Sequence, residues 1–360
     1  MSTTTMKYEY LYLKNFAESV FLNMGCSQED AILAAKTLLS ADLRGVDSHG
    51  VARLSGYVRL WQAGRINTKA TLKIVHQTPS TATVDGDKGL GLVIAPKAMQ
   101  IAIDKAQQVG SAWVAVRNSN HFGIAGQHAM QALENDMIGF AMTNASPLVA
   151  PTFAKERLLG TNPIAVAIPA NKQPPFVADF ATTTAANGKL EILQRKNLPI
   201  PTGWAQTANG EDSTNANELK NGGALLPLGG DKLHGGHKGY CLGAIVDILS
   251  AVLSGAGYGP WAPPFVSFLP LPSDSVGEGL GHFLGAMRVD AFRPKEDFLE
   301  NMDTWISRFR NAKAIEGEKV LIPGDPEREA QADRLQNGIS LLEPVIKDLT
   351  EVGKHFGIVF

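Results

Sequence analysis

The sequence lacks the features that mark secreted, membrane-spanning and nucleic-acid-binding proteins. It has two cysteines, Cys26 and Cys241, and neither stands in a paired metal-ligand or redox motif, which is typical of free thiols in a reducing compartment. The polar first ten residues contain no apolar signal core. The most apolar helix candidate, 240–255, contains Asp247 and is too short to span a bilayer. The formal net charge is −2 and no basic run is present, so neither nucleic acid nor an anionic membrane is expected as the main partner. We therefore expect a cytoplasmic protein.

Three common catalytic motifs are also absent. No G-x-G-x-x-G loop of the kind that opens a Rossmann fold is present, and the glycines at 86, 89 and 91 stand in the wrong order for one. The phosphate-binding Walker loop and the H-E-x-x-H motif of zinc proteases are missing as well. These absences alone argue against a Rossmann fold.

What the sequence does contain is the composition of an ordinary globular protein. Its 360 residues are 44% hydrophobic and 19% charged, which suggests two domains or one elaborated domain. Strand and helix periodicities alternate after about residue 70, which predicts an α/β layer. We expect long loops at 197–233 and 255–281, where glycine, proline and small polar residues dominate. Helices are expected at 8–24, 28–44, 51–61, 92–109, 125–134, 240–253, 294–312, 326–337 and 344–353, and strands at 72–75, 82–84, 112–116, 138–143, 165–168, 282–289 and 319–322.

The segment 42–54 concentrates polar groups of the kind that handle small acids. His49 and Arg53 are four residues apart, so in a helical turn they share one face. A histidine exchanges a proton near neutral pH, and an arginine can bind a carboxylate through two parallel hydrogen bonds. Together they could hold a small acid and protonate its neighbouring oxygen. On spacing alone, a capped helix end with a surface salt bridge is the more common alternative.

Four further polar clusters could carry chemistry. The cluster 117–123 follows the strand 112–116, at the end of a sheet where ligands gather, although a polar turn fits it equally well. The cluster 160–163 fits a simple turn. In 179–189, consecutive threonines leading into a helix predict N-cap chemistry and an anion site. In 234–239 the two histidines have a metal-ligand spacing, but no further cysteine or paired histidine supports a metal, so none is expected.

Five motifs, taken in order, resemble the malate/L-lactate dehydrogenase family. They are R-G-V-D-S-H-G-V-x-R-L at 44–54, N-S-x-H-F-G-x-A-G at 118–126, G-T-N-P at 160–163, D-x-A-T-T at 179–183 and H-K-G-Y at 237–240. This non-Rossmann family includes ureidoglycolate and sulfolactate dehydrogenases, diketogulonate reductase and piperideine-2-carboxylate reductase. The resemblance runs from about residue 10 to 330. The two long loops and the C-terminal helices look longer than the family pattern.

The resemblance implies NAD or NADP bound in an α/β fold of its own, a non-Rossmann sheet layer with helices, flanked by a helical domain built from both chain ends. The implied segments are 1–70 (helical, with the catalytic stretch), 71–235 (cofactor-binding) and 236–360 (helical, packing on the N-terminal helices). It also implies a homodimer with the active site near the subunit boundary.

The resemblance further implies roles for individual residues. His49 is similar to the proton donor, with Ser48 beside it, and His121 matches an acid/base position of some members. The expected catalytic residues are His49, Ser48, His121 and Asp179, and those expected to bind substrate are Arg53, Asn118 and Thr161. The expected cofactor-binding residues are Ser146, Ala178, Asp179, Phe180, Ala181, Thr182, Thr183, Thr184, His237, Lys238, Gly324, Asp325 and Pro326.

The expected function is hydride transfer between NAD or NADP and a small 2-hydroxy acid, most simply malate or lactate, without a metal. Reduction of a ketone leaves an alkoxide that needs a proton at once, which either histidine can supply. Within the family the alternative is a reductase of a cyclic imine or a sugar acid. Outside it, the alternatives are a metal-dependent hydrolase using His49, His121 and Asp179, or a protein that binds a carboxylate without turnover.

Overall fold

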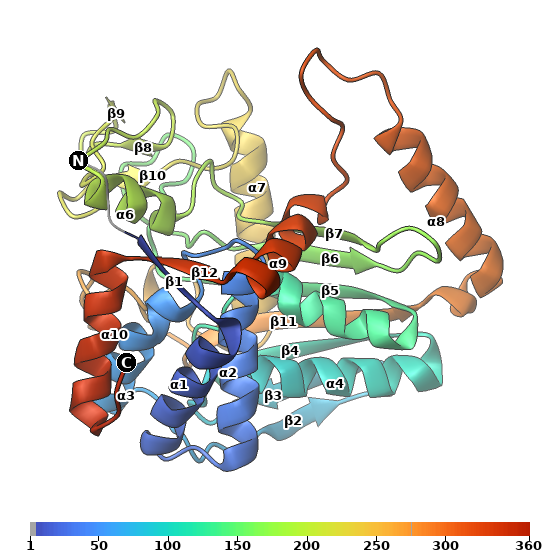
Figure 1. Cartoon of the computed structure of the whole chain (residues 1–360), viewed down its shortest axis with the longest axis horizontal. Coiled ribbons are helices and arrows are strands. Elements are labelled where there is room, and N and C mark those ends of the chain that lie inside the picture. Colours follow the sequence, from blue (N-terminus) through green and yellow to red (C-terminus); the bar gives the residue numbers. More distant parts are fainter. Residues whose placement is uncertain (1–4, 275) are drawn as a thin grey trace.

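A mixed seven-stranded sheet forms the centre of the molecule (Figure 1). The computed structural model describes residues 5–274 and 276–360. The strand order is β2-β3-β4-β11-β5-β6-β7, and only β3 and β4 run parallel to each other. The strands are β2 (Lys73–Gln77), β3 (Thr81–Asp85), β4 (Ser111–Ser119), β5 (Met137–Thr143), β6 (Ile164–Ile168), β7 (Phe176–Phe180) and β11 (Leu280–Arg288). The predicted α/β layer is confirmed.

Small side chains let a long helix pack closely on this sheet. Helix α4 (Gly91–Val109) turns Ala98, Ala102 and Ala106 toward the sheet, one above the other at a spacing of four residues. All three are fully buried in the core beneath β3, β4 and β11. The shorter helix α5 (Ala125–Met130) and the following 3₁₀ turn (Gln131–Asn135) cover the neighbouring strands β5 and β6. This packing fixes the end of β4, where the polar cluster 117–123 begins.

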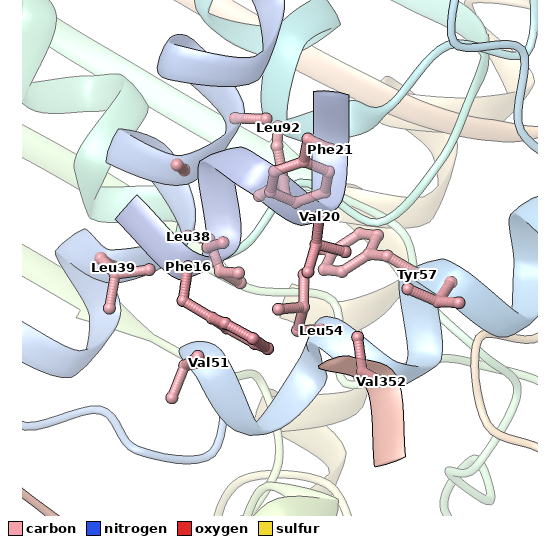
Figure 2. Packing of buried hydrophobic residues seen from close by; sticks show 14 of the residues in the cluster. Phe16, Val20, Phe21, Leu38, Leu39, Val51, Leu54, Tyr57, Leu92 and Val352 are labelled. Carbon is pink, nitrogen blue, oxygen red and sulfur yellow. The ribbon is translucent and has the colours of Figure 1, made fainter. Parts of the chain in front are cut away.

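The two ends of the chain build one helical region beside the sheet, as predicted. It contains α1 (Tyr10–Asn23), α2 (Gln28–Leu43), α3 (Leu54–Gln62) and α10 (Glu343–Phe356). Figure 2 shows their side chains gathered in one core, with Phe16, Leu38, Tyr57 and Val352 among them. Each such large apolar side chain contributes about 1.5–3 kcal/mol when fully buried. A short antiparallel pair, β1 (Thr5–Tyr8) with β12 (Ile339–Leu342), joins the ends further.

The long excursion after α6 (Asn187–Arg195) is more ordered than a loop. It holds a small sheet of β8 (Ala205–Gln206), β9 (Asp212–Ser213) and β10 (Ala224–Leu225), with its own apolar cluster. The chain then forms α7 (Gly236–Asp247), which continues as a π-helical turn (Ile248–Val252). Two further helices, α8 (Lys295–Arg310) and α9 (Asp325–Asn337), precede β12.

Three expectations about local structure need correction or addition. The strand predicted at 319–322 is wrong, because this described stretch pairs with no other strand. The edge strand β7 was not predicted, although it carries Asp179. The strand β11 was predicted, but its place in the middle of the sheet shows that the segment 236–360 also contributes to the central layer. The segment boundaries at 70 and 235 stay predictions, and residues 1–4 of the first segment lie outside the described residues.

Within residues 5–274 and 276–360, no helix is long and apolar enough to cross a membrane. Over the same residues, no three side chains of histidine, cysteine, aspartate or glutamate come together as a metal-ligand group.

Candidate active site

The loop that carries His49 is fastened to the last turn of α2. Asp42 is 1% exposed, and its Oδ2 atom accepts the Val51 N–H at 2.7 Å. Gly50 passes so close that a Cβ atom there would lie 2.2 Å from Asp42 Cγ, so only glycine fits. Burial raises the pKa of Asp42 to about 8. A short 3₁₀ turn (Val51–Arg53) then leads into α3, where a continuous helix from residue 51 was expected.

His49 and His121 lie face to face although they come from distant parts of the chain. Their ring centroids are 5.6 Å apart and the ring planes differ by 23°. Ser48 Oγ and His49 Nδ1 share a hydrogen bond of 2.8 Å. Tyr57 Oη is 2.6 Å from His121 Nδ1, and the Gly123 N–H also points at that atom from 3.4 Å. Both Nδ1 atoms are thus engaged by protein groups, which leaves the two Nε2 atoms for a ligand.

Both histidines are held in the neutral form. Burial, followed by the nearby charge of Arg53, lowers the pKa of His49 to about 4. Burial lowers the pKa of His121 well below its usual value, and the charges of His49 and Arg53 add to this effect. Each residue keeps partial solvent access in the single chain, so a ligand can reach the rings. Neutral imidazole is the form that can take a proton from a hydroxyl group.

Arg53 lies close to both histidines and lines an open cavity. Its Nε atom donates to the Ser48 carbonyl at 2.6 Å, and its Nη2 atom forms an ion pair of 3.1 Å with Glu191 Oε2 on α6. The predicted proximity of His49 and Arg53 is therefore present, through a turn rather than a regular helix. The cavity has a volume of about 570 Å³. Its wall includes Arg53, Gly56, Arg59, Glu191 and Phe265.

The long loop 255–281 contributes one wall of the site through Phe265. Its ring packs against His121 with centroids 4.7 Å apart and against Tyr57 at 5.2 Å. The Phe265 N–H donates to Ser146 Oγ at 2.9 Å, and Arg59 donates to the Phe265 carbonyl. The sequence assigned this loop no role, because its contact with His121 joins segments far apart in the chain.

A buried histidine that the sequence did not single out supports the end of β4. His282 on β11 is fully buried, and its Nε2 atom lies 2.8 Å from Ser119 Oγ. Its Nδ1 atom lies 2.7 Å from Thr143 Oγ1 on β5. Burial lowers the pKa of His282 to about 3, so it stays neutral and structural. The three strands are thereby locked together two residues before His121.

Two of the residues expected to bind substrate have other partners in this structure. The Asn118 side chain donates to Asp85 Oδ1 at 2.9 Å, so it bonds β3 rather than the histidine pair. The carbonyl of Thr161 accepts hydrogen bonds from Thr182, which joins two loops.

Asp179 lies at the end of β7 and binds the start of α5. Its Oδ2 atom accepts the Gly126 N–H at 2.7 Å. The residue is exposed in the single chain, but the atoms crowded around its carboxylate raise the pKa of Asp179 to about 6. Arg44 lies close enough to oppose that shift. A carboxylate so placed is not fixed in one charge state near neutral pH.

The threonine run after β7 does not cap a helix, and that prediction is wrong. Ala186 stands at the N-cap of α6, and the Thr182 hydroxyl instead donates to the Asn162 carbonyl at 3.0 Å. The Thr183 hydroxyl likewise donates to the backbone of Ala185. The three threonines therefore join loops beside β7, because the chain needs two more residues before α6 begins.

Another expected cofactor segment, 324–326, lies beside the same strand. The Val177 N–H donates to the Pro323 carbonyl, which places Gly324 beside β7. Asp325 accepts from the Ile322 N–H, Arg310 and Arg328, so its side chain holds that turn in shape. His237 and Lys238 are exposed in the first turn of α7, which packs at Gly239 against Leu228, and the Leu228 N–H donates to the Thr182 carbonyl.

Comparison with known proteins identifies the class of protein to which this chain belongs. A family model described as malate/L-lactate dehydrogenase matches residues 8–350. The malate dehydrogenase of Pyrococcus abyssi is 43% identical over 348 residues, which cover 96% of this chain and 94% of that protein. The L-sulfolactate dehydrogenase of Methanocaldococcus jannaschii is 37% identical over 346 residues, 96% of each chain. A crystal structure of malate dehydrogenase from Entamoeba histolytica matches with a TM-score of 0.92 at 33% identity and covers 99% of both chains.

The protein is therefore an oxidoreductase of the dehydrogenase class. More particularly, the chain belongs to the malate/L-lactate dehydrogenase family, as its five motifs suggested. Family membership decides against the hydrolase and the binding protein without turnover.

Proposed function

We propose that the protein interconverts a small 2-hydroxy acid and its 2-oxo acid with NAD or NADP, and that malate is the first substrate to test. The observation that carries this proposal is the histidine pair close to Arg53, whose side chain in turn lines a cavity of about 570 Å³. An arginine and a neutral imidazole are the two groups that a 2-hydroxy acid requires, one for its carboxylate and one for its hydroxyl proton. The malate dehydrogenases among the relatives support this choice of substrate.

The hydrogen bonds at the two Nδ1 atoms suggest how the histidines divide the work. A backbone N–H can only donate, so the Gly123 contact requires His121 Nδ1 to accept and puts the ring proton on Nε2. His121 then donates to the substrate oxygen and orients it. The partner of His49 Nδ1 is the Ser48 hydroxyl, which can both accept and donate. His49 is therefore the group that takes the hydroxyl proton, with Ser48 stabilising the charged ring.

Arg53 positions the acid. Its contact with the Ser48 carbonyl fixes the guanidinium relative to His49. A carboxylate bound to the two Nη atoms would hold the adjacent C–O group near the imidazoles, and such positioning supplies much of an enzyme's rate enhancement. Phe265 and Tyr57 exclude water from the His121 side.

The side chains around β7 fit a nicotinamide cofactor, which when bound supplies or accepts the hydride. Lys238 is an exposed cation in the first turn of α7 and can face a phosphate. Gly324 has a φ of +98° at the start of α9, and a Cβ atom there would approach Val177 Cβ to 3.2 Å. Glycine is thus required where this turn packs against β7. We assign Lys238, the threonine run and Gly324–Pro326 to cofactor binding, and leave open whether NAD or NADP is preferred.

We also propose that the protein is a homodimer that buries the outer face of α7 and its π-helical turn. This face carries a run of half-exposed apolar side chains: Ile245 (48%), Ile248 (54%), Val252 (49%) and Leu253 (57%). Contiguous exposed apolar side chains of this kind are typical of protein–protein contacts. A second copy of the chain would place this helix, which carries Lys238 in its first turn, at the subunit boundary.

The proposed reaction is tested with a panel of 2-oxo acids against NADH and NADPH, followed by nicotinamide absorbance. Oxaloacetate, pyruvate, sulfopyruvate and a cyclic imine carboxylate represent the substrate classes of the family. We expect oxidation of the reduced cofactor with at least one 2-oxo acid. Turnover of the cyclic imine alone would contradict the proposed substrate class.

A further inference from the structure

The Glu191 carboxylate forms an ion pair with Arg53, the residue proposed to bind the substrate carboxylate. Glu191 Oε2 is 3.1 Å from Arg53 Nη2, and the other oxygen, Oε1, accepts the Asn187 side-chain N–H at 2.8 Å. The Arg53 Nε atom is occupied separately by the Ser48 carbonyl. A bidentate carboxylate needs two parallel N–H groups of the guanidinium. Because Nε already donates to Ser48, a bidentate carboxylate would have to bind Nη1 and Nη2. Glu191 already forms an ion pair with Nη2.

The first turn of α6 brings Glu191 to this position by close packing. A Cβ atom on Gly188 would lie 2.3 Å from Ser48 Cβ and 3.2 Å from Arg53 Nη2. The helix therefore lies directly against the loop of Ser48, and only glycine allows this approach. Glu191 follows three residues later, on the same side of the helix. Its contact with Arg53 is thus built into the packing of α6.

The existing contacts argue that Glu191 does not serve to orient Arg53. The Nε hydrogen bond to Ser48, at 2.6 Å, already fixes the guanidinium plane. The ion pair is also partly open to solvent, with side-chain exposures of 17% for Arg53 and 29% for Glu191. Pairs of this kind are weak and easily displaced. Two carboxylates on the same Nη atoms would repel each other, so an incoming acid and Glu191 exclude one another.

We propose that Glu191 is an internal competitor for the carboxylate site: it occupies Arg53 in the free protein and is displaced by the bound acid. The inference rests on the proposed role of Arg53 in binding the substrate carboxylate. It identifies Glu191 as a residue that sets affinity for the acid rather than the rate of chemistry. The cavity beside it is lined by both residues, so the displaced side chain has room to move.

The test is the affinity of the full-length protein, saturated with NADH, for oxalate, a two-carbon dianion that cannot be reduced by hydride transfer. Calorimetric titration should show that Glu191→Gln, which keeps the side-chain shape, binds oxalate roughly 1.5- to 5-fold more tightly than wild type. The KM of the best 2-oxo acid should fall by a similar factor while kcat is unchanged. Asp348→Asn, which removes a negative charge from the same cavity wall, reports the effect of charge alone and should shift the affinity by less.

A double-mutant cycle with Arg53→Ala separates this inference from the proposed function. If Glu191 acts only through Arg53, Glu191→Gln has no effect on oxalate binding in the Arg53→Ala background. Unchanged or weaker oxalate binding by Glu191→Gln alone overturns the inference, because Glu191 would then support Arg53. If Arg53→Ala binds oxalate as tightly as wild type, the proposed role of Arg53 fails, and the inference falls with it. Arg53→Lys gives the same comparison if the alanine variant does not fold, as judged by circular dichroism.

Discussion

At the scale of single residues, the site works through the groups that its two histidines touch. Ser48 and Tyr57 are both hydroxyl partners of an Nδ1 atom, but Gly123 adds a pure donor at His121 alone. In the proposed mechanism these neighbours give the two rings different roles, one as hydrogen-bond donor to the substrate and one as proton acceptor. Desolvation keeps both rings neutral in the free protein, and a bound anion would raise their pKa values.

The lowered pKa of His49 predicts an unusual pH profile for oxidation of the hydroxy acid. The kcat/KM value reports the free enzyme, in which His49 is neutral at any pH well above its pKa of about 4. From pH 7 down to about 5.5, kcat/KM should therefore fall by less than roughly twofold. The measurement is initial rates in buffers of constant ionic strength.

Asp179, with a pKa of about 6, is a second group expected in the site that could titrate in this range. If kcat/KM declines near pH 6 in wild type but not in Asp179→Asn, the titrating group is the Asp179 carboxylate. A decline with an apparent pKa near 6.5 that survives in Asp179→Asn would contradict the desolvated state of His49.

At the scale of elements, the loop 255–281 forms one wall of the site. Hydrogen bonds to the backbone of Phe265 hold this loop in place. Ser146 accepts the N–H of Phe265 while Arg59 donates to its carbonyl. Gly56 leaves room for the ring, since a Cβ atom there would lie 2.6 Å from Phe265 Cζ. The loop is thus attached at the residue that touches His121.

Ser146→Ala should loosen this attachment. Loss of the acceptor should speed hydrogen exchange of the Phe265 amide and lower the free energy of unfolding by about 1 kcal/mol. Exchange followed by mass spectrometry of peptides covering the loop measures the first effect. Ser40→Ala, which removes a buried hydroxyl from α2, is the matched control and should leave exchange in the loop unchanged. If exchange at Phe265 stays as in wild type while cofactor affinity drops, Ser146 contacts the cofactor instead, as the sequence suggested.

The sequence predicted those elements whose cause is local. Ser27 accepts the Asp30 N–H at 3.1 Å and starts α2, as the capping pattern indicated. The polar segment 42–54 was found because its residues are neighbours in the chain. The strand prediction at 319–322 is wrong because a short apolar run before Pro323 does not indicate whether a partner strand lies beside it. The edge strand β7 was missed for the converse reason, since its pairing with β6 outweighs a weak local pattern.

The contacts that shape the site were beyond such reasoning because they join distant segments. Tyr57 meets His121, Phe265 meets both, and His282 reaches Ser119 only after the sheet has formed. Glu191 gives no signal of its own in the sequence. The family motifs identified His49, Arg53 and His121, but not the residues that set their protonation and access.

At the scale of the whole molecule, buried ionisable groups make stability depend on pH. Asp42 has a pKa of about 8 in the folded protein and an ordinary value near 3.8 when unfolded. Between these values the folded state holds a proton that the unfolded state releases, so stability falls as pH rises and levels off above about pH 8. The buried histidines act in the opposite direction, with stability lost as pH falls below about 6.5. Because histidines of the unfolded chain still bind protons up to about pH 7.5, the contribution of Asp42 is isolated by comparing wild type with Asp42→Asn, in which the histidine contribution is the same.

Asp42→Asn keeps an acceptor for the Val51 N–H and carries no titrating proton. Between about pH 6 and 7.5, the free energy of unfolding of wild type should therefore decrease relative to that of the variant by up to about 1.4 kcal/mol per pH unit. Urea unfolding followed by circular dichroism gives both curves. An equal slope in the variant would show that another group is responsible.

If the protein is a dimer that buries the outer face of α7 and its π-helical turn, a charge on that face should dissociate it. Ile248→Asp places a charge in the exposed apolar face that follows α7 and should shift the protein from dimer to monomer in light scattering. Ile32→Asp alters a side chain of similar exposure (40%) on α2 and should leave the assembly unchanged. A dimer that survives Ile248→Asp and Ile245→Asp together would place the interface elsewhere.

The division of labour between His49 and Arg53 is tested most directly by steady-state kinetics of the two alanine variants with the best 2-oxo acid. His49→Ala should lower kcat by roughly 10²- to 10⁴-fold with KM little changed, because a proton donor is lost. Arg53→Ala should mainly raise KM, because the grip on the carboxylate is lost. Cofactor affinity should be unchanged in both. Near-normal kcat in His49→Ala, or an unchanged KM in Arg53→Ala, would contradict the account.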